Sequence, residues 1–128
     1  MAKYVDGFVI VVPKDKAVEY QKMAEGGKEV WMRNGALEYM ECMGDDLETK
    51  DMGGGKPLAF TELAKAGPDE NVWFSFIVFE SRQHRDEVNA KVMAEMEREA
   101  EKYKDVKMPF ETKRMAYGGF EVKVDGEK

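Results

Sequence analysis

The 128-residue sequence contains one cysteine, Cys42, and one histidine, His84. A single cysteine excludes an intrachain disulfide and a zinc site made of cysteines alone, and a single histidine excludes a multi-histidine metal site within one chain. No apolar run approaches the roughly 20 residues that cross a bilayer. The N-terminal apolar stretch contains Asp6 and lacks a small-residue cleavage site, unlike a signal peptide. We therefore predict a cytoplasmic protein without a metal, another cofactor or a membrane partner.

Positive charge is also in short supply, because 20 Lys and Arg face 26 Asp and Glu and leave a net charge of −6. This balance argues against a nucleic-acid partner bound through a broad basic face. The hydrophobic fraction of 43% is ordinary for a globular protein. The length fits one domain over residues 1–128. Within that domain, residues 45–57 are polar and glycine-rich and predict a flexible loop, and residues 125–128 predict a tail.

The pattern of apolar residues predicts the order strand, helix, strand, strand, helix, strand. We expect helices at 14–33 and 82–103, where apolar residues recur at three- and four-residue steps. The expected strands are 4–12, 36–44, 71–79 and 114–124, with a short extension strand at 58–66. This order is typical of an α+β, ferredoxin-like βαββαβ fold, a four-stranded antiparallel sheet with two helices on one face.

The predicted strands are apolar on both faces. Residues 72–79 carry Val and Phe on one face and Trp, Ile and Phe on the other. Two helices cover only one face, so the second face needs another cover. We expect a second copy of the chain, packed sheet to sheet as a homodimer. The alternative is that the loop at 45–66 folds over this face.

The beginning of the second helix carries the first candidate site. His84 lies there with Arg82 and Arg85, and a helix N-terminus with two arginines favours an anion. One histidine would also suffice as a haem ligand. The alternative interpretation is a solvated first turn in which His84 is hydrogen-bonded locally.

Polar residues within the apolar strands form the second candidate site. Asp is unusual inside a strand, so Asp6 is either a general base with a pKa raised by burial or an acceptor of structural hydrogen bonds. A polar group on such a face needs a partner or a wet pocket. The other members are Tyr39, Glu41, Ser75 and Tyr117.

Several sequence blocks resemble one family along nearly the whole chain. YVDGFVIVVPKDK, GALEYMECMGDD, SRQHRDEVNAKVM, MPF and KRMAYGGFEV are similar to the YbaA-like bacterial proteins, domain of unknown function 1428. The resemblance implies a dimeric α/β barrel and no established activity. The matching polar positions in this sequence are Asp6, Glu41, His84, Arg85, Asp86, Asn89, Lys91, Arg114 and Tyr117.

These observations predict a small-molecule-binding protein or a small cofactor-independent enzyme, acting at a pocket of a homodimer. The alternatives are a non-catalytic structural or regulatory dimer and, by fold analogy alone, a monooxygenase-like activity. The sequence leaves the choice between binding and catalysis open. The candidate catalytic residues are Asp6 and His84, and the candidate ligand-binding residues are Tyr39, Glu41, Arg82, Arg85, Asn89 and Tyr117.

Overall fold

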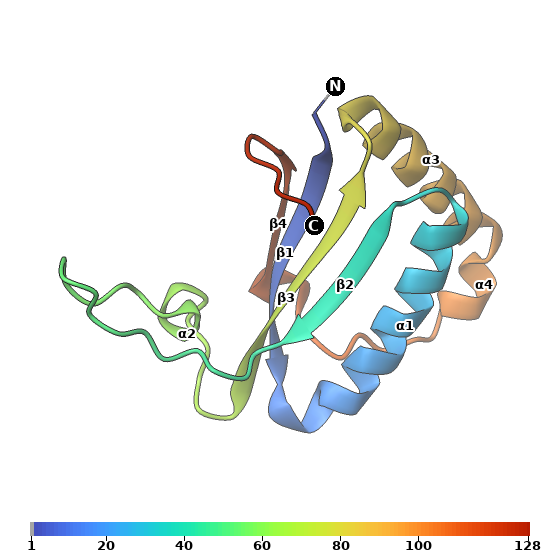
Figure 1. Ribbon diagram of the computed structural model, residues 1–128. Coiled ribbons are helices and arrows are strands. Elements are labelled where there is room, and N and C mark those ends of the chain that lie inside the picture. The colour runs from blue at the N-terminus through green and yellow to red at the C-terminus, as the bar shows by residue number, and fades with distance from the viewer. Residues whose placement is uncertain (1) are drawn as a thin grey trace.

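The computed structural model describes residues 2–128 and has one four-stranded antiparallel sheet in the order β2-β3-β1-β4. The predicted α+β class is therefore confirmed. The longer helices, α1 and α3, lie on the same side of the sheet (Figure 1). The strands are β1 (Tyr4–Pro13), β2 (Glu38–Met43), β3 (Glu70–Phe79) and β4 (Met115–Glu121). The helical segments are η1 (Lys14–Lys16), α1 (Ala17–Arg33), α2 (Phe60–Leu63), α3 (Arg82–Arg98), α4 (Ala100–Tyr103) and η2 (Thr112–Arg114).

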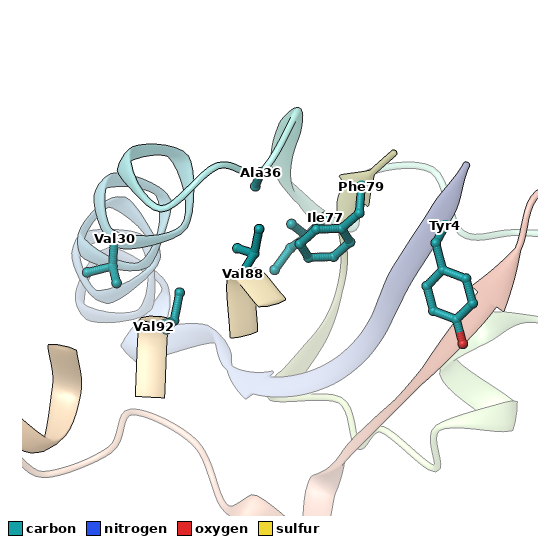
Figure 2. Packing of buried hydrophobic residues seen from close by; sticks show 7 residues of the cluster. All are labelled: Tyr4, Val30, Ala36, Ile77, Phe79, Val88 and Val92. Atoms are coloured by element: carbon teal, nitrogen blue, oxygen red, sulfur yellow. The ribbon is translucent and has the colours of Figure 1, made fainter. Parts of the chain in front are cut away.

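The two long helices bury the apolar stripe that the sequence indicates. Tyr20 and Ala24 of α1 and Val88 and Val92 of α3 are buried. Ser81 begins α3, because its Oγ accepts a hydrogen bond from the His84 backbone N–H at 3.1 Å. One part of the resulting core joins α1, α3 and the turn after α1 to β1 and β3 (Figure 2). The helices thus cover one face of the sheet, called the helix side below.

Three local predictions differ from the structure. The extension strand at 58–66 is wrong: α2 forms there instead, and the Glu62 carboxylate accepts the Ala59 N–H at 3.3 Å. A short helical turn forms in place of a strand because this segment pairs with no strand of the sheet. The helix predicted at 82–103 is interrupted at Glu99, whose φ of −107° and ψ of 17° leave the helical range. The apolar residues around Cys42 predict a buried or half-buried strand residue, but Cys42 is exposed.

The opposite face of the sheet carries the second apolar surface and is called the open face. Its cross-strand pairs include Val5 with Val78, Met40 with Phe76, and Cys42 with Phe74. Phe74 is 44% exposed. Phe120 of β4, 61% exposed, lies over Gly7, where a Cβ would come within 3.4 Å of its ring.

Residues 45–66 project from the end of β2 away from the sheet (Figure 1). They approach the open face near one end, where the Phe60 and Phe74 rings have centroids 6.4 Å apart. Met40, Phe74 and Phe120 stay exposed despite this contact. The loop expected as an alternative cover therefore leaves much of the open face uncovered.

Candidate functional site

Asp6 lies on the helix side of β1 and is 4% exposed. Its carboxylate accepts a hydrogen bond from Arg85 Nη1 at 2.8 Å and from Asn89 Nδ2 at 3.3 Å. Asn89 in turn accepts the Trp31 indole N–H at 3.0 Å. Residues from β1, α1 and α3 thus form one connected group, the Asp6 cluster (Asp6, Arg85, Asn89 and Trp31).

Arg85 supplies the positive charge that balances the negative charge of Asp6. Its guanidinium also donates to Asp86 at 2.8 Å and lies 4.8 Å above the centre of the Tyr4 ring. Burial lowers the pKa of Arg85, but the charges of Asp6 and Asp86 outweigh burial, so its pKa is raised. The Arg85 and Asn89 donors occupy one oxygen each of the Asp6 carboxylate. This geometry favours the hydrogen-bond-acceptor interpretation of Asp6 over that of a general base.

Glu41 of β2 anchors a second group, the Glu41 cluster (Glu41, Tyr20 and Tyr39). The Tyr20 hydroxyl donates to Oε1 at 2.8 Å, and the Tyr39 hydroxyl donates to Oε2 at 2.7 Å. Burial, and then the negative charge of Glu41, raise the pKa of both phenols. Both tyrosines therefore remain protonated donors at neutral pH, and Glu41 has no cationic partner among the described residues.

The Glu41 cluster opens onto a groove of about 320 Å³ between α1 and the β2–β3 part of the sheet. Its floor includes Trp73, whose ring centroid is 4.6 Å from that of Tyr20. The Trp73 indole nitrogen is buried and has no hydrogen-bond partner among residues 2–128. The lining residues of this α1–β2 groove are Gln21, Ala24, Glu25, Lys28, Tyr39, Glu41, Met43 and Trp73.

A glycine in α1 makes room for the Glu41 cluster. A Cβ at Gly27 would come within 2.7 Å of the Tyr39 hydroxyl oxygen, whereas a Cβ at neighbouring Gly26 would meet nothing within 4 Å. A glycine pair within a helix either bends the helix or lets its backbone approach a neighbour closely. Close packing against Tyr39 explains Gly27.

The other predicted site residues lie apart from the groove. The imidazole Nδ1 of His84 accepts the Glu80 N–H at 3.0 Å, and its ring packs edge-on against Phe79. Arg82 is exposed at the first residue of α3. Tyr117, 71% exposed on the edge strand β4, stacks on Phe8 with ring centroids 5.7 Å apart. The structure therefore separates the sequence candidates into the Asp6 cluster, the Glu41 cluster and residues that belong to neither.

Sequence reasoning missed three residues at these clusters. Tyr20 and Trp31 were assigned only to the apolar face of the first helix, and Trp73 only to an apolar strand. Each of the three, however, carries a hydrogen-bond donor on an aromatic ring, and a buried donor of this kind usually has a partner. A tyrosine or tryptophan among the residues predicted to be buried was the signal in the sequence that could have indicated these hydrogen-bonding groups.

Residues 2–128 contain neither a cluster of metal-ligating side chains nor a membrane-spanning helix. No group of three or more His, Cys, Asp or Glu side chains lies close enough together to hold a metal ion. None of the described helices is both long and apolar enough to span a membrane.

The fold and these clusters define an α+β protein with a four-stranded antiparallel sheet and an acidic groove beside one helix. The DUF1428 family, described as "protein of unknown function", matches residues 3–112, and the chain belongs to this family. The chain is 40% identical over 123 residues to the "Uncharacterized protein YbaA" of Escherichia coli strain K12. The aligned region covers 96% of this chain and 98% of that protein. The protein of the same name from Shigella flexneri gives the same identity and coverage. The family resemblance seen in the sequence is therefore confirmed.

Proposed function

We propose that this protein binds a small organic molecule in the α1–β2 groove. The observation that carries the proposal is the combination of aromatic and apolar walls with a carboxylate, Glu41, at which two tyrosines converge. Small-molecule sites commonly join an apolar cavity to a few well-placed polar groups. Of the predicted ligand-binding residues, Tyr39 and Glu41 belong to this site.

The Asp6 cluster supports the binding site without forming it. Asp6 accepts hydrogen bonds from Arg85 and Asn89, and neither Asp6 nor His84 lines the α1–β2 groove. Trp31 connects the two clusters, because its ring packs 6.2 Å from that of Tyr39 while its N–H is held by Asn89. The Asp6 cluster thus holds one wall of the groove in place.

The proposed assembly is a homodimer of ferredoxin-like protomers that pack through their open faces, forming a dimeric α/β barrel. The sheet order and the two helices on one side support this arrangement. The centre of the open face carries Val, Phe, Met, Cys and Gly, so a second copy would present an equally uncharged surface. Because the groove lies on the helix side, it stays accessible in such a dimer. A cytoplasmic location is part of the proposal, since an exposed lone thiol suits a reducing compartment.

The binding proposal is tested by an NMR fragment screen on ¹⁵N-labelled protein. The chain has two tryptophans, so the two indole N–H signals are assigned with Trp31→Phe. We expect binders to shift the Trp73 indole and the amides of Glu41 and Lys28 saturably. The backbone amide of Tyr117, on β4 at the opposite edge of the sheet from β2, serves as the internal control. A screen whose binders all leave the groove signals unchanged would support a dimer without a ligand instead.

The dimer proposal is tested by light scattering at micromolar concentration. We expect a mass of twice 14.6 kDa. Phe120→Glu, which places a charge on the open face, should give the monomer. Tyr117→Glu is the matched control, because Tyr117 is similarly exposed on the same strand but on the helix side. Wild-type protein at 14.6 kDa, or an equal effect of both variants, would refute the proposed interface.

A further inference from the structure

We infer that the α1–β2 groove selects a protonated amine carried on a small apolar or aromatic body. The inference rests on the proposed function of the groove and names the class of ligand. It follows from three properties of the lining residues: which hydrogen-bonding capacity is still free, which charge they carry, and which surfaces flank the carboxylate.

The oxygens of the Glu41 cluster keep free hydrogen-bonding capacity only as acceptors, whereas the Trp73 indole N–H, a donor in the lining without a partner among residues 2–128, is buried. The hydroxyl hydrogens of Tyr20 and Tyr39 are both already donated to the Glu41 carboxylate. Each carboxylate oxygen and each phenol oxygen keeps lone pairs that can accept a further bond. A ligand group at this position therefore has to be a donor, and a carboxylate or phosphate ligand would find neither phenol hydrogen free.

The charge of the lining also favours a cation. Glu25 and Glu41 contribute two negative charges, against one positive charge from Lys28. Lys28 is exposed, and its Nζ lies 3.4 Å from the Glu29 carboxylate. Glu41 is partly buried, and charge interactions strengthen where water is partly excluded. An ammonium group would thus supply the positive partner that Arg85 already supplies to Asp6.

Aromatic surface surrounds the carboxylate. Tyr39 and Trp73 line the groove, and Tyr20 packs against Trp73 beneath it. Aromatic faces attract an ammonium group and also pack against an apolar body. A volume of about 320 Å³ is at the small end of the range for ligand pockets. These features together fit a compact amine rather than a long or polyanionic molecule.

The experiment compares three probes of nearly the same size and shape: 2-phenylethylammonium, neutral 2-phenylethanol and anionic 3-phenylpropanoate. Each is titrated into ¹⁵N-labelled protein at pH 7, and the shift of the Trp73 indole signal gives its affinity. We expect the ammonium probe to bind about tenfold more tightly than the alcohol, as a charge-assisted hydrogen bond allows. The propanoate should bind more weakly than both.

Three variants show whether Glu41 causes the preference. Glu41→Gln keeps an acceptor but removes the charge, and should abolish the preference for the ammonium probe. Lys28→Gln should tighten binding of that probe about twofold by removing a competing cation. Glu25→Gln, at the exposed rim, should weaken its binding only slightly. The Lys28 and Glu25 variants alter exposed side chains, so their ranking tests the inference even where Glu41→Gln fails to fold.

The outcomes separate the two proposals. If the alcohol or the propanoate binds as tightly as the ammonium probe, the inference about the amine is overturned. The proposal that the groove binds a small molecule is then still supported. The inference is equally overturned where folded Glu41→Gln keeps the full preference, or where Lys28→Gln weakens ammonium binding. Failure of all three probes to shift groove signals at millimolar concentration, together with a negative fragment screen, overturns both the inference and the proposed function.

Discussion

The Asp6 cluster and the Glu41 cluster each hold a strand carboxylate on the helix side of the sheet with two hydrogen-bond donors. They differ in whether the protein supplies a positive charge to that carboxylate. Asp6 is buried with a guanidinium and an amide as donors, and its charge is neutralised within the protein. Glu41 has two phenols as donors, no cation, and an open groove in front of it. The difference teaches that one strand carboxylate has its counter-charge within the chain while the other lacks one, and the second is the carboxylate for which we propose a ligand.

The comparison also has an energetic side. Removing a carboxylate from water is costly, and an ion pair offsets that cost only when the geometry is good and both partners stay in place. The side chains of Asp6 and Arg85 are 5% and 17% exposed, so water cannot replace a lost partner. Glu41 keeps partial access to solvent through the groove. Disturbing the Asp6 cluster should therefore cost far more stability than disturbing the Glu41 cluster.

The largest effect is expected from Arg85→Met, which leaves the Asp6 carboxylate buried without its cation. We predict a loss of about 3–5 kcal/mol in the free energy of unfolding, measured by urea denaturation. The double variant Asp6→Asn with Arg85→Met should recover part of this loss, because a neutral amide needs no counter-charge. Glu41→Gln should cost about 1 kcal/mol. Equal losses for Arg85→Met and Glu41→Gln would contradict the distinction between the clusters.

A smaller effect is expected at alkaline pH, and it belongs to the Glu41 cluster. The pKa of Tyr20 is raised in the folded protein, so the unfolded chain loses its phenol proton first as the pH rises. The stabilising contribution is complete below pH ~10, the ordinary tyrosine pKa, and declines as the pH rises above it. We predict a fall of up to about 1.4 kcal/mol per pH unit from Tyr20, because above this pH the folded state holds one proton that the unfolded chain has lost.

Urea unfolding at several values between pH 9 and 11 measures this decline. Tyr20→Phe should make it shallower, and Tyr39→Phe should do so to a lesser degree because Tyr39 is less buried. Tyr117→Phe is the control, since the Tyr117 ring is largely exposed, and its profile should parallel that of the wild type. Identical slopes for Tyr20→Phe and Tyr117→Phe would show that the Glu41 cluster does not hold its phenol proton.

The smallest effect concerns the two glycines of α1. Gly26→Ala should stabilise the protein by about 0.5–1 kcal/mol, because alanine favours a helix and the new methyl group meets open space. Gly27→Ala gains the same helix propensity but pushes on the Tyr39 hydroxyl. We expect little or no net stabilisation from it, and a shifted Tyr39 signal. Equal thermal stabilisation by both variants would mean that Tyr39 moves aside freely.

Local patterns account for the parts of the fold that sequence reasoning anticipated. The run of apolar and aromatic residues in 71–79 and the spacing of Val88 and Val92 depend only on neighbours along the chain. The same reasoning failed at residues 58–66, where apolar residues suggested a strand but no strand was available to pair with. The predicted second helix also ran through Glu99, because the spacing of apolar residues does not show where the backbone angles leave the helical range.

The candidate site was only half accessible to such reasoning. Asp6, Glu41 and Tyr39 stood out because polar groups in apolar strands require partners. The partners themselves could not be deduced: Arg85 lies 79 positions from Asp6, and Tyr20 lies 21 positions from Glu41. His84 was a candidate because it lies at the start of the second helix with Arg82 and Arg85, and the structure shows the local hydrogen bond, from the Glu80 N–H, that the alternative interpretation expected.

The amino-acid sequence by itself determined the α+β class, the main strands and helices, the apolar character of both sheet faces and the family to which the chain belongs. These properties follow from the spacing and type of residues along the chain. Only the tertiary structure decided that Asp6 meets a cation while Glu41 meets two phenols and a groove. The physical reason is that the partner of a buried charge is set by packing between α1, α3 and the sheet, which joins residues far apart in sequence.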